Sequence, residues 1–160
     1  MGIEIERKFL VISSEWRSLV TKSLVCCQGY ISDKGKNSIR VRMLGDQGFL
    51  TIKGPRTGLR RAEFEYKIPL ADAKELLASF CHHSTVTKIR HQVPLDSRLW
   101  EVDEFSGENT GLTLAEVELD SENQSLRLPG WVGKDVSFDN RYFNANLAKS
   151  PFSTWQPESV

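Results

Sequence analysis

The sequence lacks a net charge and a long hydrophobic run, and each absence excludes a class of protein. Lys plus Arg and Asp plus Glu number 21 each among 160 residues. Proteins that bind nucleic acid or membrane surfaces in a general way usually carry an excess of basic residues, so we expect neither partner. No apolar run reaches the ~18 residues that a membrane span needs, and no basic segment followed by an apolar one indicates a leader.

Cysteine is scarce, and the motifs of several common active sites are missing. The three cysteines (Cys26, Cys27 and Cys81) are odd in number and lack the paired spacing of a metal site. A cytoplasmic, reducing location is therefore expected. The three histidines suggest no zinc site, and no nucleophile elbow is present. Residues 54–58 lack the Gly-Lys-Ser/Thr ending of a phosphate-binding P-loop.

The most informative feature that is present is an alternation in residues 2–11. Ile5 and Phe9 fall on one face of this segment, whereas Glu4, Glu6 and Lys8 fall on the other. Alternation with a period of two predicts a half-buried β-strand, with same-face side chains about 7 Å apart. Two carboxylates at this spacing repel each other unless a cation or basic groups lie beside them.

The same alternation recurs along the chain, and the charges come in pairs of one sign. The pairs are Glu4/Glu6, Arg40/Arg42, Glu63/Glu65, Lys88/Arg90, Glu101/Asp103 and Glu116/Glu118. A single charged face is usually the solvated face of an antiparallel sheet. Here the signs are segregated and the opposite faces are consistently apolar, which favours a sheet wrapped with its charged face inward.

Such a lining predicts the chemistry of its ligands. Arg and Lys neutralise phosphate oxygens, and clustered carboxylates hold hard divalent cations such as Mg²⁺. Like charges enclosed together are costly without a highly charged ligand and metal ions. The residues themselves therefore suggest a cavity for a polyphosphate and its cations.

The fold class expected from these patterns is mainly β (α+β), with one domain over residues 1–160. Helices are predicted at 69–82 and 140–149, with a third short one near residue 15, and the tail from 150 to 160 is expected to be loose.

Taken in order, these residues resemble the CYTH proteins, also called triphosphate tunnel metalloenzymes, and in particular their short bacterial branch. The resemblance rests on Glu4-x-Glu6-x-Lys8, Gln28-Gly29-Tyr30, Ile39-Arg40-Val41-Arg42, Thr51-Ile52-Lys53, Arg61-x-Glu63-x-Glu65, Lys88-x-Arg90, Glu101-Val102-Asp103 and Ala115-Glu116-Val117-Glu118. It implies an eight-stranded antiparallel β-barrel tunnel with two or three helices packed outside. It also implies hydrolysis of inorganic triphosphate to diphosphate and phosphate with Mg²⁺ or Mn²⁺.

The resemblance also assigns roles to individual residues. Phosphate would be bound by Lys8, Arg40, Arg42, Lys53, Arg61, Lys88 and Arg90. Metal would be held by Glu4, Glu6, Glu116 and Glu118, with Asp103 as a helper. Glu63, Glu65 and Glu101 would line the tunnel. Tyr30 and Lys8 would be catalytic, with Tyr30 either a base or a residue that positions water.

Several alternatives remain open from the sequence. The chain could act on nucleoside or thiamine triphosphates, or as an adenylyl cyclase, which we rank lower. It could also bind polyphosphate without turnover, or be a β-sandwich with a charged exterior. Either a monomer or a homodimer is compatible with the outward apolar faces.

Overall fold

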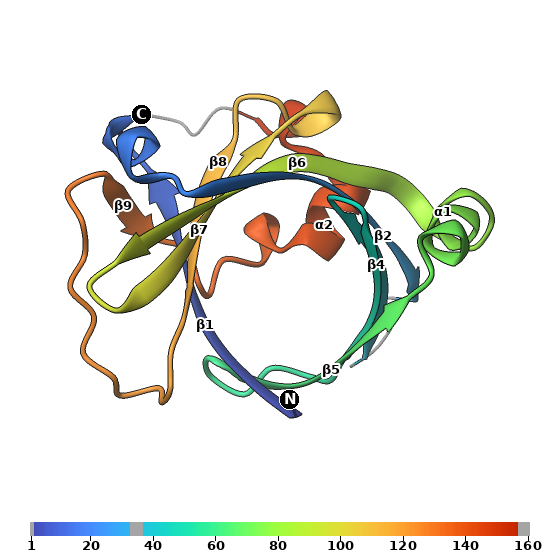
Figure 1. The fold of residues 1–160 in the computed structure, drawn as a ribbon, viewed down its shortest axis with the longest axis horizontal. Helices are drawn as coiled ribbons and strands as arrows, with labels where there is room; N and C mark the ends of the chain where they lie inside the picture. Colours follow the sequence, from blue (N-terminus) through green and yellow to red (C-terminus); the bar gives the residue numbers. More distant parts are fainter. Residues whose placement is uncertain (1, 33–36, 157–160) are drawn as a thin grey trace.

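The alternating segments all form strands, and eight of them close into an antiparallel barrel. The computed structural model describes residues 2–32 and 37–156 (Figure 1). The barrel strands are β1 (Gly2–Val11), β2 (Lys22–Ser32), β3 (Ser38–Leu44), β4 (Gln47–Lys53), β5 (Arg60–Ile68), β6 (His82–Leu95), β7 (Arg98–Phe105) and β8 (Thr113–Glu118). Their order is β5-β4-β3-β2-β6-β7-β8-β1, and pairing of β1 with β5 closes the ring. The predicted eight-stranded barrel is confirmed.

A ninth, short strand extends the sheet beyond the barrel. β9 (Val132–Asp135) pairs with the second half of β1, where Phe9 faces Asp135 and Val11 faces Val132. The first half of β1 pairs instead with β5, so this one strand joins the two ends of the sheet.

Strand register places the charged residues on the interior face. Lys8 lies opposite Glu116 and Glu6 opposite Glu118 in the pairing of β1 with β8. Lys53 lies opposite Glu63 in the pairing of β4 with β5. Directly opposed residues share a face of the sheet, so these charges all point the same way.

The main apolar core therefore lies outside the barrel wall. Phe9 is fully buried against Trp100, with ring centroids 5.7 Å apart, and Trp100 packs edge-on against Trp131 at 5.5 Å. Trp16, from the 3-10 helix η1 (Glu15–Leu19), covers the neighbouring part of this cluster. Burial of four such large side chains is a major source of stability.

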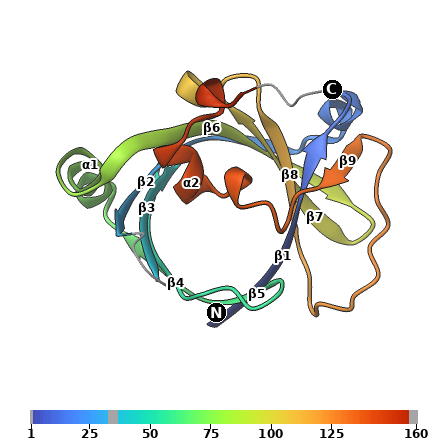
Figure 2. The ribbon, with the colours of Figure 1, turned by 180° about the vertical axis from the view of Figure 1, so that it is seen from behind.

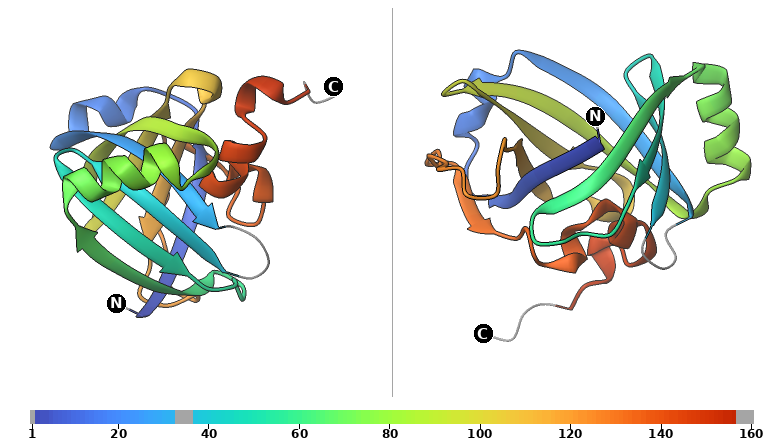
Figure 3. Two further views of the ribbon diagram at one scale, coloured as in Figure 1. Left: turned by 90° about the vertical axis from the view of Figure 1, so that its right-hand side faces the viewer. Right: turned by 90° about the horizontal axis from the view of Figure 1, so that it is seen from below.

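Helix α1 (Leu70–Ser79) lies along the outside of β3 and β4, as Figure 3 shows. Its buried Ala73 fits against Gly48, where an added Cβ would come within 2.9 Å of the alanine Cβ. The helix was predicted to reach about residue 82, but it ends at Ser79 because residue 82 already begins β6.

The predicted helix over 140–149 is instead two shorter helices at one end of the barrel (Figure 2). Phe143 adopts an extended conformation (φ −73°, ψ 136°), and it separates η3 (Asn140–Tyr142) from α2 (Asn144–Lys149). The two remaining 3-10 helices of the described residues are η2 (Gly107–Asn109) and η4 (Phe152–Thr154).

The first part of the expected loose tail is packed. Trp155 lies edge-on to Tyr142 and to Phe152, at 5.1 Å in both cases, and its Nε1 donates to the carbonyl oxygen of Ser150. Residues 157–160 lie outside the described residues. Over the ranges that the structure describes, every helix is too short or too polar to cross a membrane.

Candidate active site

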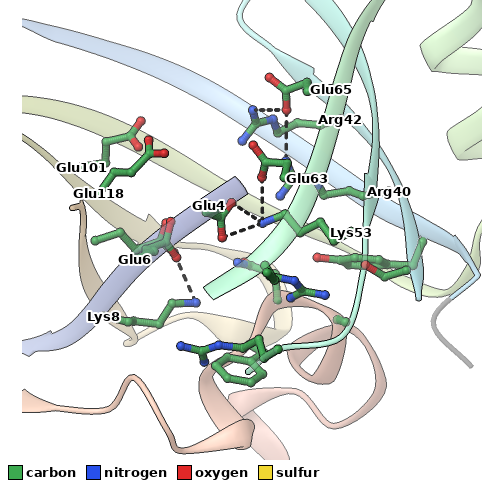
Figure 4. Close-up of a pocket in the computed structure, with 18 of the residues that line it drawn as sticks. Glu4, Glu6, Lys8, Arg40, Arg42, Lys53, Glu63, Glu65, Glu101 and Glu118 are labelled. Atoms are coloured by element: carbon green, nitrogen blue, oxygen red, sulfur yellow. Dashed lines mark hydrogen bonds and ion pairs between the residues drawn. The ribbon is translucent and has the colours of Figure 1, made fainter. Parts of the chain in front are cut away.

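The inward charges surround a cavity of about 400 Å³ within the barrel (Figure 4). Of the described residues, seven carboxylates and seven cations line it. The carboxylates are Glu4, Glu6, Glu63, Glu65, Glu101, Glu116 and Glu118, and the cations are Lys8, Arg40, Arg42, Lys53, Arg56, Arg61 and Arg90. Tyr30 lines the same cavity.

The wall of the cavity formed by β1 and β8 contains carboxylates that repel one another. Burial and the neighbouring Glu116 and Glu4 raise the pKa of Glu6 well above its usual range. Burial, Glu4 and Glu101 likewise raise the pKa of Glu118. A hard divalent cation would relieve this repulsion, and carboxylate oxygens are the ligands that such a cation prefers.

These donors suit Mg²⁺ or Mn²⁺ chemically, although they are not already gathered as a coordination sphere. Among the described residues, no three His, Cys, Asp or Glu side chains converge at metal-binding distance. Several of the carboxylates are held by ion pairs instead. Glu116 accepts from Lys8 Nζ at 3.2 Å, and Glu4 accepts from Lys53 Nζ at 2.9 Å.

The opposite wall, from β3, has more donors than acceptors. Glu65 Oε2 accepts from Nη2 of both Arg40 and Arg42 at 3.3 Å, and from Thr51 Oγ1 at 2.8 Å. Nε of both arginines is buried without a hydrogen-bond partner. Burial and the positive charges of Arg40 and Arg90 lower the pKa of Arg42. A surplus of buried cations of this kind favours a bound anion.

Lys53 lies between two carboxyl groups whose pKa values are shifted in opposite directions. Its Nζ is 2.9 Å from Glu4 and 3.2 Å from Glu63. Burial would raise the pKa of Glu4, but a hydrogen bond with Glu63 and the charge of Lys53 lower it to about 2. Burial and the same hydrogen bond raise the pKa of Glu63 to about 7. Glu4 is therefore the ionised member of the pair.

Lys88 and Asp103 do not line the cavity, although the sequence grouped them with the phosphate and metal ligands. Both side chains are completely buried on the inward face of the barrel next to α2, with Lys88 Nζ 2.8 Å from Asp103 Oδ2 and 3.2 Å from Asn144 Oδ1. Asp103 also accepts two hydrogen bonds of 2.9 Å from Arg90. Of this cluster, Arg90 and Asn144 line the cavity.

The two predicted catalytic residues both lie at the cavity but have separate hydrogen-bond partners. Tyr30 is 6 % exposed, and its hydroxyl accepts from Gln28 Nε2 at 3.1 Å. Lys8 Nζ donates to the carbonyl oxygen of Tyr142 at 3.2 Å and pairs with Glu116.

Sequence reasoning missed lining residues that come from loops and from the C-terminal segment. Arg56 lies in the turn after β4, and Ser137, Phe143 and residues 144–146 come from the segment around η3 and α2. Loops have no alternation that assigns a residue to a face. The one available signal in the sequence was a basic residue, Arg56, in a turn marked by Pro55 and Gly58.

A closed antiparallel barrel whose interior opposes arginines and glutamates defines a tunnel for a polyanion and cations. The sequence model of the CYTH domain matches residues 2–149, and the chain belongs to the CYTH family. The family resemblance inferred from the sequence is confirmed.

The relatives and a solved structure agree with this membership. The chain is 44 % identical to an inorganic triphosphatase of Acetivibrio thermocellus, over 98 % of this chain and 99 % of that protein. It is 37 % identical to an inorganic triphosphatase of Nitrosomonas europaea, over 92 % and 97 %. The crystal structure of the inorganic triphosphatase NE1496 superposes with a TM-score of 0.66 at 32 % identity, covering 94 % of this chain and 97 % of that one.

Proposed function

We propose that this protein hydrolyses inorganic triphosphate to diphosphate and phosphate inside the barrel. The observation that carries the proposal is the composition of the cavity, where Arg40 and Arg42 of β3 face the carboxylates of β1 and β8. Relatives named inorganic triphosphatase align with nearly the whole chain, which supports the same activity here.

We assign binding of the substrate to the basic wall. Arg40 and Arg42 bind phosphate oxygens with the N–H donors that Glu65 leaves free. Lys53 and Lys8 neutralise the remaining phosphate groups of the triphosphate. These groups are fixed by strands, so they stabilise charge that develops in the transition state without reorganising. Arg61 and Arg90 complete this set.

Metal dependence belongs to the same proposal. Glu4, Glu6, Glu116 and Glu118 would hold Mg²⁺ or Mn²⁺, which would supply Lewis-acid stabilisation of the phosphate oxygens. Glu63 and Glu101 line the tunnel beside them. We assign to Asp103 the positioning of Arg90, in place of a metal contact, because two hydrogen bonds fix the guanidinium to it.

For Tyr30 we propose a role in orienting the attacking water. Its hydroxyl lies at the cavity and already accepts a hydrogen bond from Gln28, so the hydroxyl proton is free to be donated into the cavity. Lys8 would stabilise charge next to it. Cytoplasmic location stays a prediction, with which the three free cysteines agree.

Substrate choice is tested by phosphate release from inorganic triphosphate, ATP and thiamine triphosphate, each with Mg²⁺ or Mn²⁺. The proposal expects the highest kcat/KM by far for inorganic triphosphate. Preference for an organic triphosphate would replace the substrate assignment, and binding without release from any of them would make the protein a receptor. Light scattering of the same preparation decides between monomer and homodimer.

A further inference from the structure

Two guanidinium groups in the lining have no carboxylate partner among the described residues. Arg56 donates to the carbonyl oxygen of Ser137, and Arg61 donates to the carbonyl oxygen of Gly54 through Nε at 3.1 Å and Nη2 at 2.8 Å. The other lining cations each have a carboxylate oxygen within 3.3 Å, namely Lys8, Arg40, Arg42, Lys53 and Arg90. Arg40 and Arg42 share one carboxylate, that of Glu65, whereas Arg56 and Arg61 pair with none of the described carboxylates.

The turn that presents Arg56 is held by specific contacts. The backbone N–H of Thr57 donates to the carbonyl oxygen of Arg60 at 2.8 Å, and the N–H of Leu59 donates to Glu122 Oε1 at 2.9 Å. Gly58 has a φ of 62°, and an added Cβ would lie 2.5 Å from that same carboxylate oxygen. The positive φ favours glycine at this position, and the absence of a Cβ leaves room for the Glu122 carboxylate beside the turn.

Phe143 links Arg56 to the tunnel. The guanidinium carbon of Arg56 lies 4.9 Å from the centroid of this ring, and Lys8 Nζ lies 5.6 Å from the same centroid. Arg56 is also 5.6 Å from the ring of Phe138, which is 70 % exposed. An arginine stacked on rings in this way keeps its N–H edge available for an anion.

The position of these residues is at a mouth of the tunnel. Arg56, Arg61 and Phe143 line the main cavity and also a second hollow, which is completed by Pro55, Gly58, Phe138 and Asn140. Burial and the charge of Arg61 lower the pKa of Arg56, against the attraction of Glu6. Glu4 and Asp135 also attract Arg56, but both guanidinium groups bond only to backbone carbonyl oxygens, and a bound anion would give them a charged acceptor.

We propose that Arg56, together with Arg61, binds the free terminal phosphate of inorganic triphosphate at this mouth and so favours it over esterified triphosphates. A terminal phosphate group offers three acceptor oxygens and the larger charge, whereas an esterified one has given up one oxygen to its substituent. Inorganic triphosphate has a free phosphate at both ends, and ATP has one only. The inference rests on the proposed function and adds to it that Arg56 binds the second terminal phosphate of inorganic triphosphate.

The test compares Arg56→Gln with the unaltered protein on two ligands. KM for inorganic triphosphate should rise about tenfold or more, since charge-assisted hydrogen bonds contribute roughly 1.5–3 kcal/mol and 1.4 kcal/mol is a factor of ten. The inhibition constant of ATP against triphosphate hydrolysis should change less than about twofold. Arg56→Lys should give an intermediate KM, because the charge remains and the planar fork is lost.

Arg60→Gln is the matched control, since Arg60 directly precedes Arg61 but is exposed and does not line the cavity. It should leave both constants unchanged, and thermal melting should show that each variant is folded. An unchanged KM in Arg56→Gln, or an equal loss for triphosphate and ATP, would overturn the inference. Absence of hydrolysis by the unaltered protein would reject the proposed function instead. Calorimetric titration of the same two ligands would then still decide the role of Arg56.

Discussion

Arg90 and Asp103 form a fork-to-fork ion pair, with Nε to Oδ1 and Nη2 to Oδ2 both at 2.9 Å. The carboxylate is completely buried and also lies 2.8 Å from Lys88 Nζ. Burial opposes ionisation of Asp103, yet the charges of Arg90 and Lys88 lower its pKa. This buried triad fixes the one guanidinium that extends from β6 into the cavity.

Asp103→Ala should destabilise the fold strongly, because it removes the carboxylate that pairs with the buried Lys88 and leaves Arg90 with only Glu101 and Glu116. We expect a loss of about 3–5 kcal/mol in the free energy of unfolding, measured by urea denaturation. Asp120→Ala is the control, since Asp120 pairs with Arg98 at 3.2 Å but its side chain is 87 % exposed. That pair should contribute less than about 1 kcal/mol. Equal losses in the two variants would contradict the buried triad.

Glu6→Gln should separate stability from catalysis. Removing the charge relieves repulsion from Glu116 and Glu4, so the melting temperature should stay equal or rise. Turnover of inorganic triphosphate should nevertheless fall at least about 100-fold, and more Mg²⁺ should be needed for half-maximal activity. The control is Glu108→Gln, because Glu108 is an exposed residue of η2. Normal turnover in Glu6→Gln at ordinary Mg²⁺ would remove Glu6 from the metal ligands.

Asp135 should make the stability depend on pH in the acid range. Its carboxylate accepts from Arg7 Nη2 and from the N–H of Ser137, both at 2.8 Å. Although burial opposes it, these bonds lower the pKa of Asp135 below its ordinary value. A lowered pKa in the folded state means that the stabilisation is complete above the unfolded pKa of about 3.9. It is lost as the pH falls through the lower folded value.

The check is the difference in free energy of unfolding between the unaltered protein and Asp135→Asn. It should be largest near neutral pH and disappear in strong acid. Asp46→Asn, in the exposed turn between β3 and β4, is the control and should show no comparable dependence. A difference that persisted unchanged to low pH would indicate that Asp135 acts through its shape and not through its charge.

Tyr30→Phe tests the proposed orientation of water. The substitution keeps the buried ring and removes the hydroxyl that accepts from Gln28. We expect kcat to fall by about 10- to 100-fold with little change in KM, since only a group that acts on the reacting atoms is lost. A normal kcat would limit Tyr30 to a structural role in the wall. The pH profile of kcat separates a base, which would shift it, from a positioning hydroxyl.

The sequence predicted the barrel well because alternation directly encodes which face each strand residue takes. It placed Glu4, Glu6 and Lys8 on one interior face, and the structure has them there. Alternation does not encode depth, however. Lys88 shares the inward face of β6 with Arg90, but it lies deeper, next to α2, where Asn144 and Asp103 bind it and cover it from the cavity.

Features outside the strands were harder to predict for a related reason. The helical spacing over 140–149 gave no sign that Phe143 would be extended and would point toward Lys8 and Arg56. Contacts of this kind depend on how distant segments meet at the barrel end. Arg56 was missed because a turn has no periodicity from which the direction of a side chain can be read.

The most direct test of the central claim is product analysis of inorganic triphosphate by ³¹P NMR, with Mg²⁺ and with a chelator. The account predicts one diphosphate and one phosphate for each triphosphate consumed, and no products once the metal is removed. The same amounts with the chelator would contradict the metal assignment. An intact triphosphate signal in the presence of Mg²⁺ and Mn²⁺ would contradict the hydrolysis itself.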